Sequence, residues 1–335
     1  MKALVCEQPG TLRLVEREAP LAPPEGWVTV DISHVGICGT DYHIFEGKHP
    51  YLSYPRIMGH ELSGRVVDAA GPFSVGELVI INPYISCGTC RACLRGKPNC
   101  CYNIAVLGVH RDGGMCERIN VPLANLYAAN QLQPLEAAMV EFLAIGAHAV
   151  RRSELGAADR VLVVGVGPIG LGVALFARLR GAQVYLLDVS RTRLDMVAGK
   201  FGFDNVFAVE DGVDSIMTGS GGEGYDIVFD ATGNSAAIEA GFAYVAHGGT
   251  YVLVSVVSDA ISFADPDFHK REMKLVGSRN ATREDFDTVI AAIEGGKIDT
   301  KSLLTRTVRL DALPDEFGDL LNNRDKVIKA IVEVA

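Results

Sequence analysis

The chain has 335 residues, of which 48% are hydrophobic and 21% charged, an ordinary globular balance with room for two domains. Its formal net charge is -10 and it has no basic run, which argues against nucleic-acid binding, because phosphate contacts need clustered Lys and Arg. No segment resembles a signal peptide or a convincing membrane helix, so we expect a cytoplasmic protein without membrane partners. Eight cysteines in that compartment favour metal binding over disulfides.

Residues 1 to about 85 are predicted to form short strands and turns. The segment 28–37 alternates apolar and polar residues, as a half-buried strand does, and 61–70 and 76–84 have a similar pattern. Glycine and proline separate these segments, as they do at turns. A compact β-rich domain, such as a small barrel, is therefore expected.

The stretch from Cys38 to Glu61 contains a thiolate at Cys38, an imidazole at His60 and carboxylates at Asp41 and Glu61. These groups suit zinc, and three protein ligands would leave a fourth position open, as catalytic zinc sites do. Glu61 is either a ligand or a residue that orients His60. Glu141 lies in a helix predicted over 134–155, and is a ligand, a partner of the metal-bound water, or an ordinary salt-bridged residue. Asp41 is a turn residue or orients a ligand.

A second metal site is predicted in the irregular stretch 87–101. Two successive C-x-x-C steps place three thiolates around one centre, and a later cysteine completes the set. Four thiolates without an open position form a structural zinc site. The expected ligands are Cys87, Cys90, Cys93 and either Cys100 or Cys101.

From Asp159 onward the pattern changes to buried strands that alternate with helices. This order predicts an α/β domain with a doubly wound parallel sheet. A helix is expected over 282–298, and the last strand, 326–334, either extends this domain or rejoins the first. The five strands expected in the domain lie within 160–165, 183–188, 225–233, 248–256 and 274–279.

A dinucleotide site is predicted where the first of these strands ends. Gly165, Gly167 and Gly170 spell G-x-G-x-x-G, follow a strand and open a helix, and Asp188 ends the next strand 18 residues after Gly170. Asp188 would accept hydrogen bonds from the adenosine ribose and repel a 2′-phosphate, which favours NAD over NADP. Arg193, like Arg191, could instead meet a phosphate or stack on adenine. FAD or another nucleotide is the alternative.

The combination of zinc with a nicotinamide cofactor indicates alcohol oxidation or carbonyl reduction, with the metal acting as a Lewis acid. The Thr40 hydroxyl, two residues after Cys38, could pass on the alcohol proton, and His43 could release it to water. The alternative for His43 is a surface or cofactor-contacting residue. The cofactor contacts expected overall are Gly165, Gly167, Pro168, Ile169, Gly170, Asp188, Arg193, Thr232 and Ser255.

Taken together, CGTDYH, GHE, the cysteine quartet, GVGPIG and DATG resemble the zinc-dependent medium-chain dehydrogenase/reductase family over essentially the whole chain. The resemblance implies a GroES-like β-barrel catalytic domain over 1–146, a Rossmann domain over 147–281 and a C-terminal segment, 282–335, that completes the first domain. It implies two zinc ions per chain, NAD, and a homodimer or homotetramer. It assigns the catalytic zinc to Cys38, His60 and either Glu61 or Glu141, and the structural zinc to Cys87, Cys90, Cys93 and Cys101. The family's usual residue after the helix glutamate is proline; here it is Phe142, so the reach of that glutamate is open.

Within this family, the segments 39–61, 108–114 and 265–282 most resemble bacterial sugar-acid dehydrogenases that oxidise L-galactonate or L-gulonate at C5. The polar insert between Cys38 and His60, which includes Tyr51, suits such a polyhydroxylated small molecule better than an apolar alcohol. The alternatives are a sorbitol/xylitol-type polyol dehydrogenase, an L-threonine dehydrogenase, or a non-catalytic protein that binds zinc and NAD. Candidate partners for the substrate carboxylate are Lys48, Arg56, Arg111 and Arg279.

Overall fold

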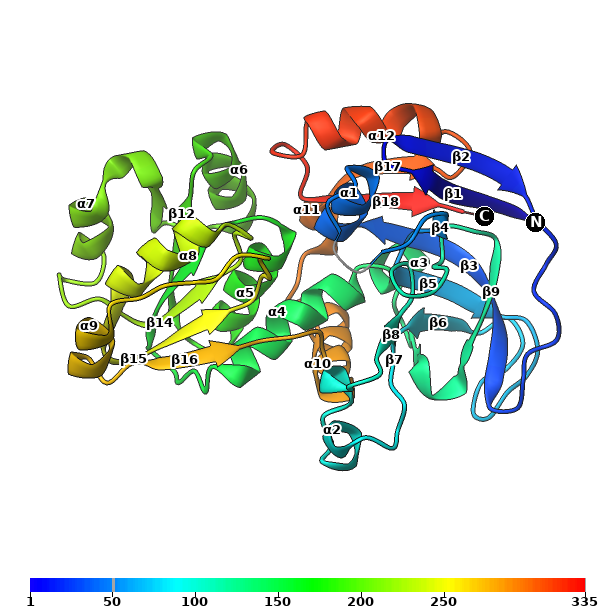
Figure 1. Ribbon diagram of the computed structural model, residues 1–335, viewed down its shortest axis with the longest axis horizontal. Coiled ribbons are helices and arrows are strands. Elements are labelled where there is room, and N and C mark those ends of the chain that lie inside the picture. Colours follow the sequence, from blue (N-terminus) through cyan, green and yellow to red (C-terminus); the bar gives the residue numbers. More distant parts are fainter. Residues whose placement is uncertain (50–51, 335) are drawn as a thin grey trace. The chain divides into compact units, whose positions relative to one another are not determined.

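The computed structural model describes residues 1–49 and 52–334, so Tyr51 of the insert lies outside the described residues. The chain forms two compact units (Figure 1): Met1–Glu141 together with Phe286–Ala335, and Phe142–Asp285. None of the described helices is long and apolar enough to span a membrane.

The first unit is built on two sheets of short strands. The larger has the order β10-β6-β5-β3-β18-β17, with β9 also paired to β3, and the smaller has the order β2-β1-β4. A third ladder joins β7 and β8. The strands are β1 Lys2–Gln8, β2 Thr11–Glu16, β3 Trp27–Ile37, β4 Arg56–Ile57, β5 Glu61–Val66, β6 Leu78–Ile81, β7 Tyr84–Ile85, β8 Ala105–Val106, β9 Arg118–Pro122, β10 Leu126–Ala128, β17 Leu304–Arg309 and β18 Lys329–Glu333.

The C-terminal strand rejoins this unit. β18 pairs antiparallel with β3 and parallel with β17, and Figure 1 shows the red β18 beside the blue β3. Both strands are apolar and buried, so the tail contributes to the core of the first unit. As a result, residues from the two ends of the chain lie side by side.

Helices of the first unit position its candidate site. Phe317, fully buried in α12, contacts the rings of Tyr42 and Phe45 of α1 at centroid distances of 5.5 and 4.9 Å. These aromatic contacts anchor α1 against the C-terminal segment. The helices are α1 Gly39–Phe45, α2 Arg91–Leu94, α3 Pro134–Ala137, α11 Thr300–Leu303 and α12 Leu313–Asn322, with short 3-10 turns at Pro98–Cys100 and Leu123–Asn125.

The single helix predicted over 134–155 is interrupted. α3 ends at Ala137, and α4 runs from Val140 to Arg152 after a turn at residues 138–139. The good helix formers of this segment hide the break, because neither a glycine nor a proline marks it. The interruption places Glu141 in the first turn of α4.

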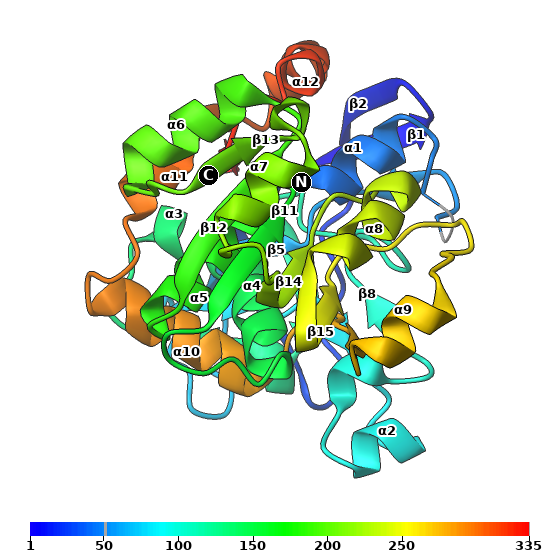
Figure 2. The same ribbon diagram turned by 90° about the vertical axis from the view of Figure 1, so that its left-hand side faces the viewer.

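The second unit is a six-stranded parallel sheet with the order β13-β12-β11-β14-β15-β16, and Figure 2 shows the strands from β12 to β15 side by side. From β11 the chain adds strands first on one side, to β13, and then on the other, from β14 to β16. The position between β11 and β14 is therefore the switch point at which open α/β sheets form a binding crevice. The elements are β11 Arg160–Val164, α5 Pro168–Leu179, β12 Gln183–Asp188, α6 Arg191–Phe201, β13 Val206–Ala208, α7 Val213–Thr218, β14 Tyr225–Asp230, α8 Ser235–Gly241, β15 Val245–Leu253, α9 Asp265–Lys270 and β16 Lys274–Gly277, with 3-10 turns at Val209–Asp211 and Phe242–Tyr244. The helix α10 Arg283–Glu294 begins at the end of this unit and continues into the first. The doubly wound parallel sheet predicted from the sequence is confirmed.

Candidate catalytic centre and nucleotide site

Cys38 and His60 meet in the first unit. Cys38 is the N-cap of α1, and its Sγ accepts a hydrogen bond of 3.2 Å from the backbone N–H of Thr40. His60 directly precedes β5, is buried, and places Nε2 at 3.0 Å from Cys38 Sγ. Asp41 is fully buried and its Oδ2 accepts the backbone N–H of Cys38 at 2.9 Å, so it orients the cysteine backbone.

Glu141 brings a carboxylate to the same place from α4. One of its oxygens, Oε1, accepts a hydrogen bond from the Tyr84 hydroxyl, whereas Oε2 is buried without a partner among the described residues. Ligand atoms of His60, Glu61 and Glu141 all lie within 4.8 Å of one another, as do those of Cys38, Asp41 and His60. A buried, unpartnered carboxylate oxygen is costly unless a cation or a donor occupies the site.

Glu61, in contrast, is already neutralised. Both of its oxygens accept hydrogen bonds of 2.7 Å from Nζ of Lys329, which also donates to the carbonyl of Ile37 at 3.2 Å. The two side chains are almost completely buried, at 1% and 0% exposure. Gly36 of β3 makes room for them, because a Cβ there would lie 1.9 Å from Glu61 Oε2.

Burial and neighbouring charges shift the pKa values of the cluster. Burial lowers the pKa of His60 but the Cys38 thiolate raises it, and the thiolate prevails, so the pKa is well above its ordinary value. Burial raises the pKa of Glu141 to about 7, against the opposing effect of His60. The pKa of Tyr84 is raised well above its usual value by burial and by the Glu141 carboxylate. A thiolate, a carboxylate and an imidazole in this setting fit a divalent cation, with zinc preferred by the donor set.

The two residues expected to move a proton lie on one face of α1. Thr40 is half-buried and His43, one helical turn later, is exposed. His49, from the polar insert, lies near His43: burial first, and then the charges of His43, His110 and His60, lower the pKa of His49. The insert therefore borders the His60 site within the first unit.

The cysteine lobe brings four sulfurs together, those of Cys87, Cys90, Cys93 and Cys101. Neighbouring sulfurs are 3.4 to 3.9 Å apart, close to the edge of about 3.8 Å that a zinc tetrahedron with bonds of about 2.3 Å requires. Backbone N–H groups of Thr89 and Cys90 lower the pKa of Cys87 to about 5, which favours the thiolate that a metal needs. Cys100 is exposed and is not part of the group, so the cluster can accept a structural zinc through Cys101.

The glycine turn of the second unit has the geometry that a dinucleotide requires. Gly165 has a φ of +86°, and Gly167 is the N-cap of α5, which begins at Pro168 and continues through Ile169. A Cβ on Gly170 would lie 1.8 Å from the Gly165 carbonyl oxygen, so only glycine lets α5 pack on this turn. The N-terminus of the helix and the close backbone fit pyrophosphate.

Asp188 is held under this turn. Its Oδ2 accepts the backbone N–H of Val166 at 2.7 Å, and its Oδ1 accepts that of Ser190 at 2.8 Å. Each carboxylate oxygen keeps a second lone pair, so both remain able to accept ribose hydroxyls. Arg193 of α6 lies next to the turn, because a Cβ on Gly167 would lie 3.4 Å from its Nη1.

Thr232 and Ser255, also expected to contact the cofactor, both donate to the buried Asp230. The hydroxyl of Thr232 lies 2.9 Å, and that of Ser255 3.2 Å, from Asp230 Oδ1. A Cβ on Gly165 would lie 3.0 Å from Thr232, which places Thr232 at the switch point beside the glycine turn. Asp230 therefore braces the two loops that border the turn.

The four cations proposed for the substrate carboxylate have different surroundings. Lys48 is exposed and forms an ion pair with Glu46 at 3.0 Å. Arg56 pairs with Asp112 at 3.4 Å, and the guanidinium of Arg111 lies 5.0 Å from the Trp27 ring centroid. The fourth, Arg279, is exposed and belongs to the second unit.

Three residues with evident roles were not identified from the sequence: Tyr84, Asp230 and Lys329. Asp230 begins the D-A-T-G motif, so that motif carried a signal. Lys329 is the one cation in the apolar run 327–332, which is a signal of a buried partner. The sequence contains no signal for Tyr84, because only the fold brings this residue of β7 to Glu141 of α4.

Two family models match the chain, the alcohol dehydrogenase GroES-like domain at residues 24–131 and zinc-binding dehydrogenase at residues 168–295. The chain is 40% identical to L-galactonate-5-dehydrogenase of Escherichia coli K12, over 99% of this chain and 98% of that protein. It is 32% identical to 2-dehydro-3-deoxy-L-galactonate 5-dehydrogenase of Pseudoalteromonas atlantica, over 96% of both.

Among solved structures, rspB of Escherichia coli CFT073, an alcohol dehydrogenase complexed with NADH, superposes with a TM-score of 0.92 at 29% identity and covers 100% of this chain and 99% of that one. These matches agree with the four-sulfur lobe and with the two groups of donor atoms that share His60. The chain is thus a member of the zinc-dependent medium-chain dehydrogenases, oxidoreductases that act on CH–OH donors with a nicotinamide cofactor.

Proposed function

We propose that this dehydrogenase oxidises a secondary alcohol of a sugar acid, L-galactonate or L-gulonate at C5, with NAD as the hydride acceptor. The observation that carries the proposal is His60, shared by two groups of donor atoms, one with Cys38 and Asp41 and one with Glu61 and Glu141, in a chain 40% identical to L-galactonate-5-dehydrogenase over almost its entire length. The polar insert that borders His60 supports a polyhydroxylated substrate.

The catalytic zinc is proposed to bind Cys38 Sγ, His60 Nε2 and Glu141 Oε2. Glu141 is preferred over Glu61 because its Oε2 has no partner among the described residues, whereas Lys329 occupies both oxygens of Glu61. When bound, zinc would act as a Lewis acid on the substrate oxygen, which lowers the pKa of the alcohol. The structural zinc is proposed to bind the four cysteines of the lobe.

The chain's own residues then have distinct tasks. Asp41 fixes Cys38, and Tyr84 fixes one oxygen of Glu141 so that the other faces the cluster. Thr40 receives the alcohol proton and His43, which is exposed, exchanges it with water. Asp188 accepts the ribose hydroxyls and disfavours NADP, while Gly165, Gly167 and Gly170 admit the pyrophosphate.

Domain boundaries near residues 146 and 281 and a homodimer or homotetramer are proposed from the family. Sedimentation of the zinc-loaded protein would test the second of these proposals. A monomer at assay concentration would contradict it.

The function is tested by following NADH formation with L-galactonate, L-gulonate, D-sorbitol, xylitol and L-threonine. Turnover restricted to the two aldonates is the expected result. Preferential turnover of sorbitol, xylitol or threonine would refute the substrate assignment and retain the dehydrogenase. The carboxylate partner is then identified by single replacements with glutamine of Lys48, Arg56, Arg111 and Arg279. Replacing the true partner should raise KM for aldonates more than for neutral polyols.

A further inference from the structure

A hollow of about 570 Å³ lies in the second unit where the strands of the parallel sheet begin, at the end opposite the glycine turn. Asp226 at the beginning of β14 lines it, whereas Asp230 at the end of the same strand lies next to the turn. Four residues of strand separate them, roughly 13 Å. The hollow is therefore distinct from the dinucleotide site.

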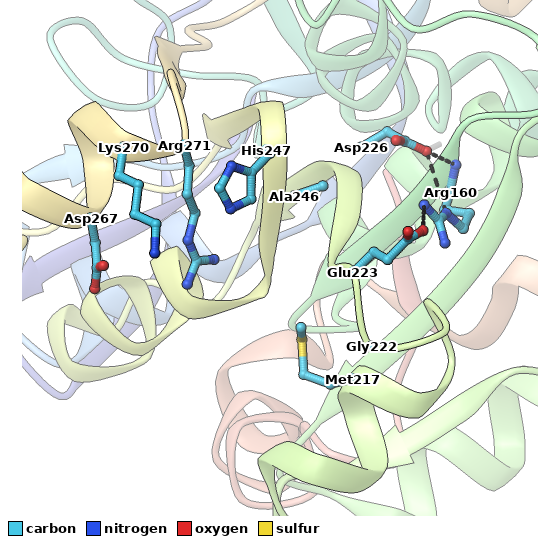
Figure 3. Close-up of a pocket in the computed structure, with 10 residues that line it drawn as sticks. All are labelled: Arg160, Met217, Gly222, Glu223, Asp226, Ala246, His247, Asp267, Lys270 and Arg271. Atoms are coloured by element: carbon cyan, nitrogen blue, oxygen red, sulfur yellow. Dashed lines mark hydrogen bonds and ion pairs between the residues drawn. The ribbon is translucent and has the colours of Figure 1, made fainter.

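One wall of the hollow carries one cation and two carboxylates and is firmly built. Arg160 donates to the carbonyl of Ser220 and pairs with Glu223 at 3.3 Å and Asp226 at 3.7 Å. Its backbone N–H also donates to Asp226 at 2.7 Å. Figure 3 shows these three charged side chains together on one side.

The other wall is made by an irregularity of β15. Tyr225 pairs with Val245 and Ile227 with Thr250, so four residues of β15, 246–249, face a single residue of β14. This bulge directs His247 out of the sheet, where it is exposed. The end of α9 fixes the bulge, because Gly248 N–H donates to the Arg271 carbonyl at 2.6 Å and Arg271 Nη1 donates to Val245 O at 2.8 Å.

This second wall is cationic. His247, Lys270 and Arg271 lie side by side on it (Figure 3), and the acidic residue among its lining side chains is Asp267. In the part of the chain that the structure describes, His247 and Lys270 have no hydrogen-bonded or ion-paired partner, and only Nη1 of Arg271 is engaged. The Lys270 ammonium and the Arg271 guanidinium outnumber the Asp267 carboxylate on this wall, and such a concave surface is suited to an anion.

We propose that the hollow is a second ligand site, for a small metabolite that carries a phosphate or carboxylate group. His247, Lys270 and Arg271 bind the acid group, and Glu223 on the facing wall accepts from the hydroxyls of the same molecule. The volume, at the scale of small-molecule pockets, accommodates a sugar phosphate or a sugar acid. The site does not depend on the chemistry proposed for the catalytic centre.

The test is calorimetric titration of the zinc-loaded protein saturated with NADH, which blocks the pyrophosphate position. The probes are glucose 6-phosphate, gluconate and neutral glucose, so the first two distinguish a phosphate from a carboxylate ligand. We expect one of the two anions to bind and glucose not to bind. H247Q/K270Q should weaken anion binding about tenfold or more, since the contact of the Lys270 ammonium and that of the His247 ring are both lost.

Lys274→Gln is the matched control, because Lys274 is an exposed lysine of the same unit that pairs with Glu154 outside the hollow. It should bind the anion as the unmodified protein does. Anion binding that H247Q/K270Q leaves unchanged, or no binding of either anion, would overturn the proposal. His247 and Lys270 are exposed, so circular dichroism of the double variant should match that of the unmodified protein.

Discussion

The buried pair between Lys329 and Glu61 offers a quantitative test of how the first unit is assembled. Lys329→Met keeps the length and apolar stem of the side chain but removes its charge, which leaves the Glu61 carboxylate buried without its cation. Removing one partner of such a pair costs about 3–5 kcal/mol, against about 0–1 kcal/mol for an exposed pair. With two contacts of 2.7 Å and almost no exposure, we expect a loss in the upper range.

The assay is denaturant unfolding of the zinc-loaded protein, followed by tryptophan fluorescence. The only tryptophan, Trp27, lies in β3 of the first unit, so the signal reports the unit that contains the pair. Lys326→Met, an exposed lysine three residues earlier, is the matched control and should change the free energy of unfolding by less than about 0.5 kcal/mol.

Adding Glu61→Gln to Lys329→Met should restore most of the lost stability, because an amide no longer carries the unmatched charge. A loss below about 1 kcal/mol for Lys329→Met alone would refute the buried-pair reasoning. A double variant less stable than the single one would show that packing, not charge, dominates.

Three further predictions concern the metal, the cofactor and acid stability. Cys38→Ser should remove one zinc per chain and nearly all activity while the fold persists. The control Cys100→Ser, at an exposed cysteine outside the four-sulfur group, should change neither the zinc content nor the activity. Metal analysis and NADH formation measure the two quantities, and full activity of metal-depleted Cys38→Ser would contradict the catalytic zinc. Asp188→Ser should shift the ratio of kcat/KM toward NADP, and an unchanged ratio would show that Asp188 does not face the ribose. Burial raises the pKa of Asp285, but hydrogen bonds from His148 and Arg151 lower it by more, so this pKa lies below its usual value. A depressed carboxyl pKa gives stability that is complete above the unfolded-state pKa of about 4 and is lost as pH falls below it; Asp285→Asn should flatten that acid loss of stability in pH-dependent denaturant unfolding, and an unchanged slope would contradict the assignment.

The features that the sequence indicates most clearly depend on short spacings. The glycines from Gly165 to Gly170 act within one turn, and the sulfurs from Cys87 to Cys101 lie in one lobe, so their geometry is encoded locally. Strand and helix alternation likewise reveals the parallel sheet, since each period is a local property. The family and fold class follow from such signals and are confirmed by the comparisons.

The features that were missed depend on contacts between distant segments. Tyr84 reaches Glu141 across 57 positions and Lys329 reaches Glu61 across 268, and no spacing rule relates such pairs. The break between α3 and α4 was hidden for another reason, because residues 138–139 are alanine and methionine, both good helix formers. Short strands such as Val206–Ala208 show too few residues for a period to appear.

The choice between Glu61 and Glu141 shows why motif adjacency is a poor guide to ligand identity. Both are buried carboxylates whose oxygens lie within 4.8 Å of a His60 ring nitrogen, so neither chemistry nor distance separates them. What separates them is the partner: a strand from the C-terminus brings an ammonium to Glu61, while Glu141 meets only a neutral hydroxyl that satisfies one oxygen. A buried carboxylate with its own cation gains little from a second one, whereas a half-satisfied carboxylate gains the full Coulombic attraction of a metal. In the proposed ligand set, Lys329 therefore determines which glutamate would bind the metal, although it lies 268 positions from Glu61.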